Sequence, residues 1–188
     1  MTKKFRLLKR RIGCENSLFT TFLDDIQSPD GEIIRNFFIT APKGKNKNML
    51  TGVAVLPVFK GKIALLHIYR HALGGFGWEV PRGFIDKGET TKKSASRELT
   101  EETGLTCNAK DLVFLGFSTP DGGVLAARIA IFAALHCRQA KNFKMEEFGH
   151  RELKFVTTKK MEQMIASGKV DDSATLLAYY KYSRIPAG

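Results

Sequence analysis

Three glutamates, Glu98, Glu101 and Glu102, stand close together in a chain whose formal net charge is +11. At positions i, i+3 and i+4 they share one face if the segment is helical. Like charges at that spacing repel one another, and the repulsion grows when the carboxylates are buried. A hard divalent cation relieves it, and magnesium commonly meets one or two carboxylates together with substrate phosphates. The spacing therefore indicates either a Mg²⁺ site for a phosphate-bearing substrate or a solvated acidic helix face.

The residues around these glutamates form a longer pattern. The stretch GFIDKGETTKKSASRELTEETGL, residues 83–105, has the form G-x5-E-x7-R-E-U-x-E-E-x-G-U, in which U is apolar. With ordinary residue frequencies, a chance match to its defined positions has a probability on the order of 10⁻⁸ per start position. This form is the Nudix box, so the chain resembles the Nudix hydrolase family.

The resemblance implies hydrolysis of a nucleoside diphosphate linked to another group, assisted by Mg²⁺ or Mn²⁺. It implies that Glu98 and Glu102 are the main metal ligands, and that Glu101 is catalytic as well and can hold a second ion. The backbone carbonyl of Arg82, just before the box, completes the metal site. Such a site orients the diphosphate and acidifies a water for in-line attack on phosphorus.

Four other box residues have structural roles in the resemblance. The two glycines permit tight turns, and an ion pair between a glutamate and an arginine ties the loop to the helix. These residues are Gly83, Glu89, Arg97 and Gly104.

The general base is expected outside the box. The family places an acidic loop before its last strand, and FKMEEFGH, residues 143–150, occupies that place here. Glu147 is the predicted base or further metal ligand, with Glu146 and Glu152 as alternatives. The other interpretation of each is an ordinary surface glutamate.

The segment IYRHALGGFGWEVPRGFID, residues 68–86, is similar to the ADP-ribose and nucleoside diphosphate sugar pyrophosphatase group. On that match Arg70 contacts the diphosphate and Trp78 is a pocket wall that also packs on the core. Pro120 follows the box at a distance similar to that group's pattern. The alternatives are a surface arginine for Arg70 and a plain turn for Pro120.

Arg82 departs from this group, which usually has alanine there. W-x-x-P-R-G is instead similar to Nudix enzymes that act on RNA 5′ ends or dinucleoside polyphosphates. A third alternative is a non-catalytic Nudix-fold regulator that binds a ligand. Such modules often lose box carboxylates, and this box is complete.

The elements that must position these residues can be predicted from the same sequence. Thr90 or Thr91 caps a helix over 90–103, and Gly104 ends it. Segment 71–83 is glycine-rich and is predicted to be irregular. Two hairpins are expected, one over 17–40 with its turn at 28–31 and one over 51–70 with its turn at 60–62. Three further strands are expected at 111–119, 124–135 and 152–157. Two helices are expected at 158–168 and 171–184, and Asp172 or Ser173 caps the second.

This order predicts an α+β fold, an α/β/α sandwich in which helices enclose a mixed sheet and a loop–helix–loop carries the box. Residues 1–48 are predicted to form an N-terminal β-strand element and residues 49–188 the Nudix hydrolase domain. By resemblance, the N-terminal element builds a homodimer and adds groups to the base site. Its aromatic candidates, equally readable as core residues, are Phe19, Phe22, Phe37 and Phe38.

Composition limits the partners and the location. The basic charge favours anionic ligands, and we expect a small nucleotide-sugar substrate. RNA is less favoured, because the Lys and Arg residues are spread through the chain. Three scattered cysteines, with no CxxC spacing, indicate reduced thiols. No apolar run is long enough to span a membrane, so a cytoplasmic protein without a membrane partner is expected.

Overall fold

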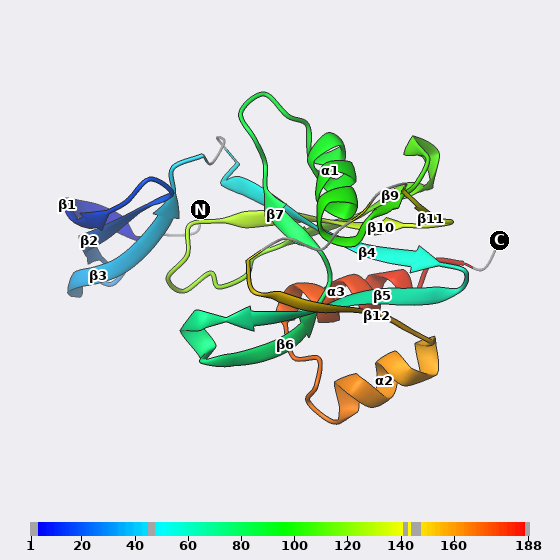
Figure 1. Cartoon of the computed structure of the whole chain (residues 1–188). Helices are drawn as coiled ribbons and strands as arrows, with labels where there is room; N and C mark the ends of the chain where they lie inside the picture. The colour runs from blue at the N-terminus through cyan, green and yellow to red at the C-terminus, as the bar shows by residue number, and fades with distance from the viewer. Residues whose placement is uncertain (1–3, 45–47, 141–142, 144–147, 187–188) are drawn as a thin grey trace. The chain divides into compact units, whose positions relative to one another are not determined.

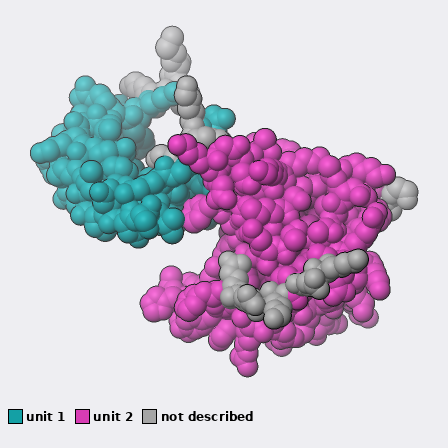
Figure 2. All heavy atoms as spheres, turned by 45° about the horizontal axis from the view of Figure 1, so that its top comes forward, with its two compact units in different colours: residues 1–51, 119–128 teal, residues 52–118, 129–188 magenta. Residues whose placement is uncertain are grey.

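The computed structural model describes residues 4–44, 48–140, 143 and 148–186 (Figure 1). The chain forms two compact units, residues 1–51 with 119–128 and residues 52–118 with 129–188 (Figure 2).

The first unit contains a three-stranded antiparallel sheet in the order β1-β2-β3. Its strands are β1 (Arg6–Glu15), β2 (Phe19–Gln27) and β3 (Ile33–Pro42). The predicted hairpin is confirmed, and Gly31 has a positive φ of 96° in the turn between β2 and β3. Strand β1 was not predicted from the sequence, because its apolar residues do not alternate. Instead, Arg10 and Arg11 pair with Asp24 and Asp25 of β2 at 2.6 and 2.7 Å.

The second unit is built on a sheet in the order β12-β5-β4-β10-β9, with β6 paired to β5 and β7 to β4. The bounds are β4 (Leu50–Phe59), β5 (Lys62–Arg70), β6 (Gly75–Glu79), β7 (Arg82–Phe84), β9 (Leu112–Ser118), β10 (Arg128–Ala134) and β12 (His150–Val156). A short pair, β8 (Leu105–Thr106) and β11 (Arg138–Gln139), lies apart from it. Short 3₁₀ turns occupy His71–Leu73 and Ala109–Asp111.

Helices cover the sheet in the predicted α/β/α arrangement. Figure 1 shows α1 (Thr91–Thr103) on one side, and α2 (Thr158–Ala166) with α3 (Ser173–Tyr182) on the other. The core between the sheet and the last two helices includes Leu56, Ile131 and Met161, all with no more than 1% exposure. No helix among the described residues is long and apolar enough to cross a membrane.

The predicted helix caps are confirmed. The Thr90 side chain accepts a hydrogen bond from the Lys93 N–H at 3.2 Å and begins α1, and Gly104, at φ 64°, ends it. Asp172 caps α3 by accepting from the Thr175 N–H at 2.9 Å.

The prediction of irregular structure over 71–83 is wrong. β6 pairs with β5 from Gly75 opposite Arg70 to Glu79 opposite Leu66. Gly74, at φ 65°, reverses the chain before β6. The glycines remove the side-chain alternation that identifies a strand, but the ladder is made of backbone hydrogen bonds and does not need it.

Candidate active site

The helix α1 buries two of the three box carboxylates. Glu98 and Glu102 are 6% and 3% exposed, whereas the Glu101 side chain is 55% exposed. Glu102 Oε2 accepts a hydrogen bond from the Arg82 N–H at 3.1 Å. A Cβ added to Gly83 would run into the Glu98 carboxylate. The two buried carboxylates therefore converge on Arg82 and Gly83, and the predicted metal ligands lie together.

Arg97 holds the box loop against the helix. Its Nη1 lies 2.6 Å from Glu98 and 2.9 Å from Glu101, its Nε lies 3.2 Å from Glu89, and its Nη2 donates to the Phe84 carbonyl at 2.9 Å. Burial opposes the charge of this guanidinium, but the surrounding carboxylates raise the pKa of Arg97 above its ordinary value. The ion pair expected between Glu89 and Arg97 is thus present, within a wider network that also holds Glu98.

Glu89 is also fixed from the helix side. The Ser94 hydroxyl donates to its Oε2 at 2.7 Å, and this hydrogen bond, together with Arg97, lowers the pKa of Glu89. The carboxylate therefore stays ionised and keeps the loop and the first turns of α1 in register.

The buried pair suits a magnesium ion. Among the described residues, no three His, Cys, Asp or Glu side chains form a ready-made metal cluster. Magnesium does not need one, because it binds through one or two carboxylates and fills its octahedron with water and phosphate oxygens. Two buried carboxylates one helical turn apart repel strongly. Arg97 offsets this at Glu98, and a cation between Glu98 and Glu102 would offset it at both.

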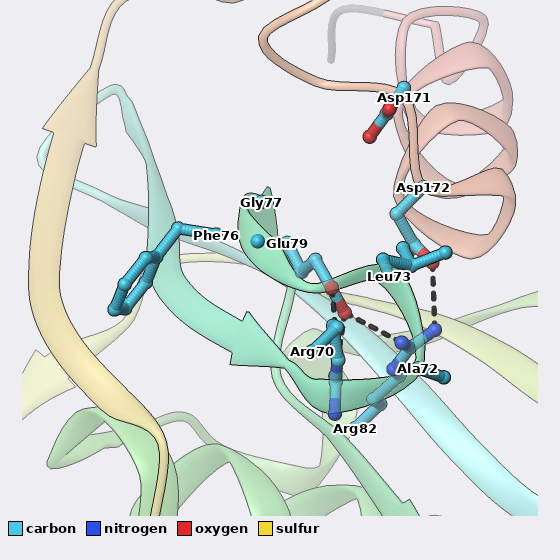
Figure 3. Close-up of a pocket in the computed structure, with 10 residues that line it drawn as sticks. Arg70, Ala72, Leu73, Phe76, Gly77, Glu79, Arg82, Asp171 and Asp172 are labelled. Atoms are coloured by element: carbon cyan, nitrogen blue, oxygen red, sulfur yellow. Dashed lines mark hydrogen bonds and ion pairs between the residues drawn. The ribbon is translucent and has the colours of Figure 1, made fainter.

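Beside these carboxylates lies a pocket of about 440 Å³ with a network of ion pairs on its wall (Figure 3). Glu79, on β6, is 3% exposed. Arg70 donates two hydrogen bonds to the Glu79 carboxylate, at 2.9 and 2.6 Å. Arg82 Nη2 forms an ion pair with the same carboxylate at 2.7 Å. Hydrogen bonding to Glu79 raises the pKa of Arg70. One buried carboxylate therefore holds two guanidinium groups at the pocket.

Arg82 also reaches the start of α3. Its Nη1 donates to Asp172 Oδ1 at 2.8 Å, and Figure 3 shows the Arg82 guanidinium joined by dashed lines both to Asp172 and to Glu79. The sequence predicts Asp172 only as a helix cap and predicts no role for Glu79. The one signal for Glu79 was a carboxylate within the strand-forming WEV of residues 78–80.

The other two predicted substrate residues are Trp78 and Pro120. Trp78 is on β6, but its ring stacks on His67 at 4.4 Å, with Lys154 Nζ 4.4 Å from its centroid. Because side chains alternate along a strand, Trp78 faces away from the side that carries Glu79, and it is not among the residues that line the pocket. Its predicted packing against the core is confirmed. Pro120 lies in segment 119–128, which groups with the first unit.

Of the three candidates for the general base, the structure describes only Glu152. Glu146 and Glu147 lie outside the described residues. Glu152 is on β12, where its side chain is 47% exposed and lies 3.3 Å from Lys154 Nζ. The role of Glu147 stays a prediction.

Comparison with known proteins identifies the family. The NUDIX domain matches residues 49–177. A CMP-5′-(N-acetyl-N-hydroxy-3-aminopropyl)phosphonate hydrolase of Streptomyces rubellomurinus is 31% identical over 96 residues, which are 50% of this chain and 42% of that protein. An ADP-ribose pyrophosphatase of Bacillus subtilis is 26% identical over 158 residues, covering 84% of this chain and 80% of the relative.

The fold is also shared with a solved structure. The crystal structure of an ADP compounds hydrolase superposes with a TM-score of 0.80 at 18% identity, over 97% of this chain and 94% of that one. The resemblance seen in the box is thereby confirmed at the level of the fold. Because the NUDIX match spans more than half of the chain and includes all of α1 with its buried carboxylates, this protein belongs to the Nudix hydrolase family.

Proposed function

We propose that the protein is a Mg²⁺-dependent pyrophosphohydrolase of a nucleoside diphosphate sugar, with ADP-ribose as the leading candidate, and that it releases a nucleoside monophosphate and a sugar phosphate. The observation that carries this proposal is the burial of Glu98 and Glu102 against Arg82 and Gly83. The ADP-ribose pyrophosphatase among the relatives supports the substrate class.

Each side chain has a part in this reaction. Glu98 and Glu102 would hold the metal, with the Arg82 carbonyl as a further ligand and Glu101 available for a second ion. A bound Mg²⁺ or Mn²⁺ supplies charge neutralisation and a more acidic water. Arg97 pairs with Glu98 and holds its carboxylate in place. Glu147 is our candidate for the group that takes the proton of the attacking water.

Arg70 is suited to receive the diphosphate. A guanidinium has five N–H donors, and Arg70 directs Nε and one N–H of Nη2 at Glu79. The others can donate to a phosphate in the pocket that Arg70 lines. Since Glu79 fixes the arginine before substrate arrives, little side-chain freedom is lost on binding.

A panel of substrates tests the function. We expect ADP-ribose to be hydrolysed faster than GDP-mannose, UDP-glucose, a diadenosine polyphosphate or capped RNA when each is supplied with Mg²⁺. Excess EDTA should abolish turnover, because without a cation the two carboxylates repel the negatively charged diphosphate and nothing acidifies the attacking water. Turnover that persists in EDTA would contradict the mechanism. Faster, strongly salt-dependent hydrolysis of the RNA would instead favour a nucleic-acid substrate, because binding by counterion release weakens steeply with salt.

The first unit supports a homodimer as part of the proposal. Its sheet exposes large apolar side chains on both faces, with Ile12 at 64% on one face and Phe38 at 49% on the other. Exposed apolar surface of this kind typically marks an interface. We expect light scattering to give twice the chain mass of 21.0 kDa. Ile12→Lys with Phe38→Glu should produce monomers, whereas Phe114→Glu, at an exposed phenylalanine of the second unit, should leave the mass unchanged. A wild-type monomer would rule the dimer out.

The location completes the proposal. All three cysteines, Cys14, Cys107 and Cys137, are free thiols. Free thiols persist in a reducing compartment, which supports the cytoplasm.

A further inference from the structure

The residues just before the Nudix box are tied to the first turn of α3, about 90 positions later in the chain. The Val80 N–H donates to Thr175 Oγ1 at 3.0 Å, and Arg82 Nη1 donates to Asp172 Oδ1 at 2.8 Å. The Thr175 hydroxyl in turn donates to Asp172 Oδ2 at 2.8 Å. Together these hydrogen bonds link the two segments on both sides of Pro81, and Thr175 is fully buried, whereas the ion pair of Arg82 with Asp172 borders the pocket.

Arg82 is the point where this link meets the carboxylates of α1. Its backbone N–H donates to Glu102 Oε2 at 3.1 Å, while its side chain is held by Glu79 and Asp172. A shift of Arg82 would move both the donor that orients Glu102 and the carbonyl that is predicted to bind metal. The side-chain anchors of Arg82 are thus anchors of the metal site.

We propose that Asp172 is a positioning residue for the metal site and acts through Arg82 on Glu102. This proposal rests on the proposed function, since it takes Glu102 as a metal ligand. Asp172 is the anchor that ties Arg82 to α3, whereas Glu79 also holds Arg70 on the pocket wall. Groups that orient metal ligands in this way typically change metal affinity or activity 10- to 100-fold when they are replaced.

The simpler interpretation is that Asp172 only caps α3. The two roles use different oxygens, because Oδ2 accepts from the Thr175 N–H and Oδ1 accepts from Arg82. Asparagine caps a helix about as well as aspartate, but it has no charge to hold the guanidinium. Asp172→Asn therefore weakens the link to Arg82 while it keeps the cap.

The experiment is a Mn²⁺ titration of the substrate-free protein, followed by electron paramagnetic resonance. We expect Asp172→Asn to bind Mn²⁺ about tenfold more weakly than the wild type, with a nearly unchanged melting temperature. Thr157→Ala is the matched control, because it removes the side-chain cap of α2. It should lower the melting temperature and leave Mn²⁺ affinity unchanged. Asp172→Ser, which also preserves a cap, is the second variant if Asp172→Asn disturbs folding.

A double-mutant cycle tests the route through Arg82. In the Arg82→Ala background, Asp172→Asn should weaken Mn²⁺ binding by less than about twofold, because coupled residues are non-additive. Additive losses, or an Asp172→Asn protein that binds Mn²⁺ within about twofold of the wild type, would overturn the positioning role alone. If Glu102→Gln leaves Mn²⁺ affinity unchanged, the metal assignment fails, and the positioning role fails with it.

Discussion

Glu102→Gln is expected to lower the turnover number by about three orders of magnitude while leaving the fold nearly intact. Loss of a ligand charge removes several kcal/mol of stabilisation from the transition state, and each 1.4 kcal/mol or so is a factor of ten in rate. The glutamine carbonyl can still accept the hydrogen bond from the Arg82 N–H. The measurements are kcat at saturating Mg²⁺ and the thermal melting curve.

Glu162→Gln is the control for this variant. Glu162 lies on α2, where it accepts a hydrogen bond from the Tyr179 hydroxyl at 3.1 Å. The same chemical change there should leave kcat unaltered. Near-wild-type turnover by the Glu102→Gln enzyme would remove Glu102 from the metal site.

Gly83→Ala is expected to reduce kcat/KM by about 100-fold with only a modest loss of stability. The added methyl would occupy the space of the Glu98 carboxylate. That carboxylate ends a flexible side chain, so it can swing away, and overpacking of this kind costs about 1–3 kcal/mol. The tight turn expected at Gly83 is absent, because Gly83 lies inside strand β7 without a positive φ. Alanine therefore adds no backbone strain there. Two orders of magnitude in kcat/KM correspond to about 2.7 kcal/mol of lost transition-state binding.

Gly44→Ala is the control for Gly83→Ala, because it makes the same substitution at a glycine where the added methyl group meets no side chain among the described residues. Among the described residues, no atom comes within 4 Å of a Cβ added to Gly44, which belongs to the first unit. Its variant should match the wild type in kcat/KM and in melting temperature. If Gly83→Ala also keeps full activity, Glu98 is not held where the metal site requires it.

The box helix could be predicted from sequence because its determinants are local. Thr90 and Gly104 delimit α1 through side-chain capping and a left-handed backbone, both of which are readable over a few residues. The turn of the β4–β5 hairpin is equally local, with Lys60 and Gly61 at φ 48° and 72°. The ion pair of Glu89 with Arg97 followed from the family pattern.

The missed features depend on contacts between distant residues. Strand β1 is held to β2 by Arg10 and Arg11, and hydrophobic alternation does not reveal such pairing. The link from Arg82 to Asp172 joins positions 90 residues apart. In the sequence, Arg82 was interpreted as a departure from the family pattern, and Asp172 was interpreted as a helix cap. Only the fold shows that they share an ion pair.

That link also bears on the order of events during synthesis. Chains generally fold as they emerge, from the N-terminus onward. A nascent chain that contains α1 but still lacks residues 172–175 has its box carboxylates without the anchor of Val80 and Arg82. The proposed cation site would therefore take its final form only once α3 has been made and docked, so that competence for hydrolysis depends on the synthesis of α3 and not on that of α1 alone.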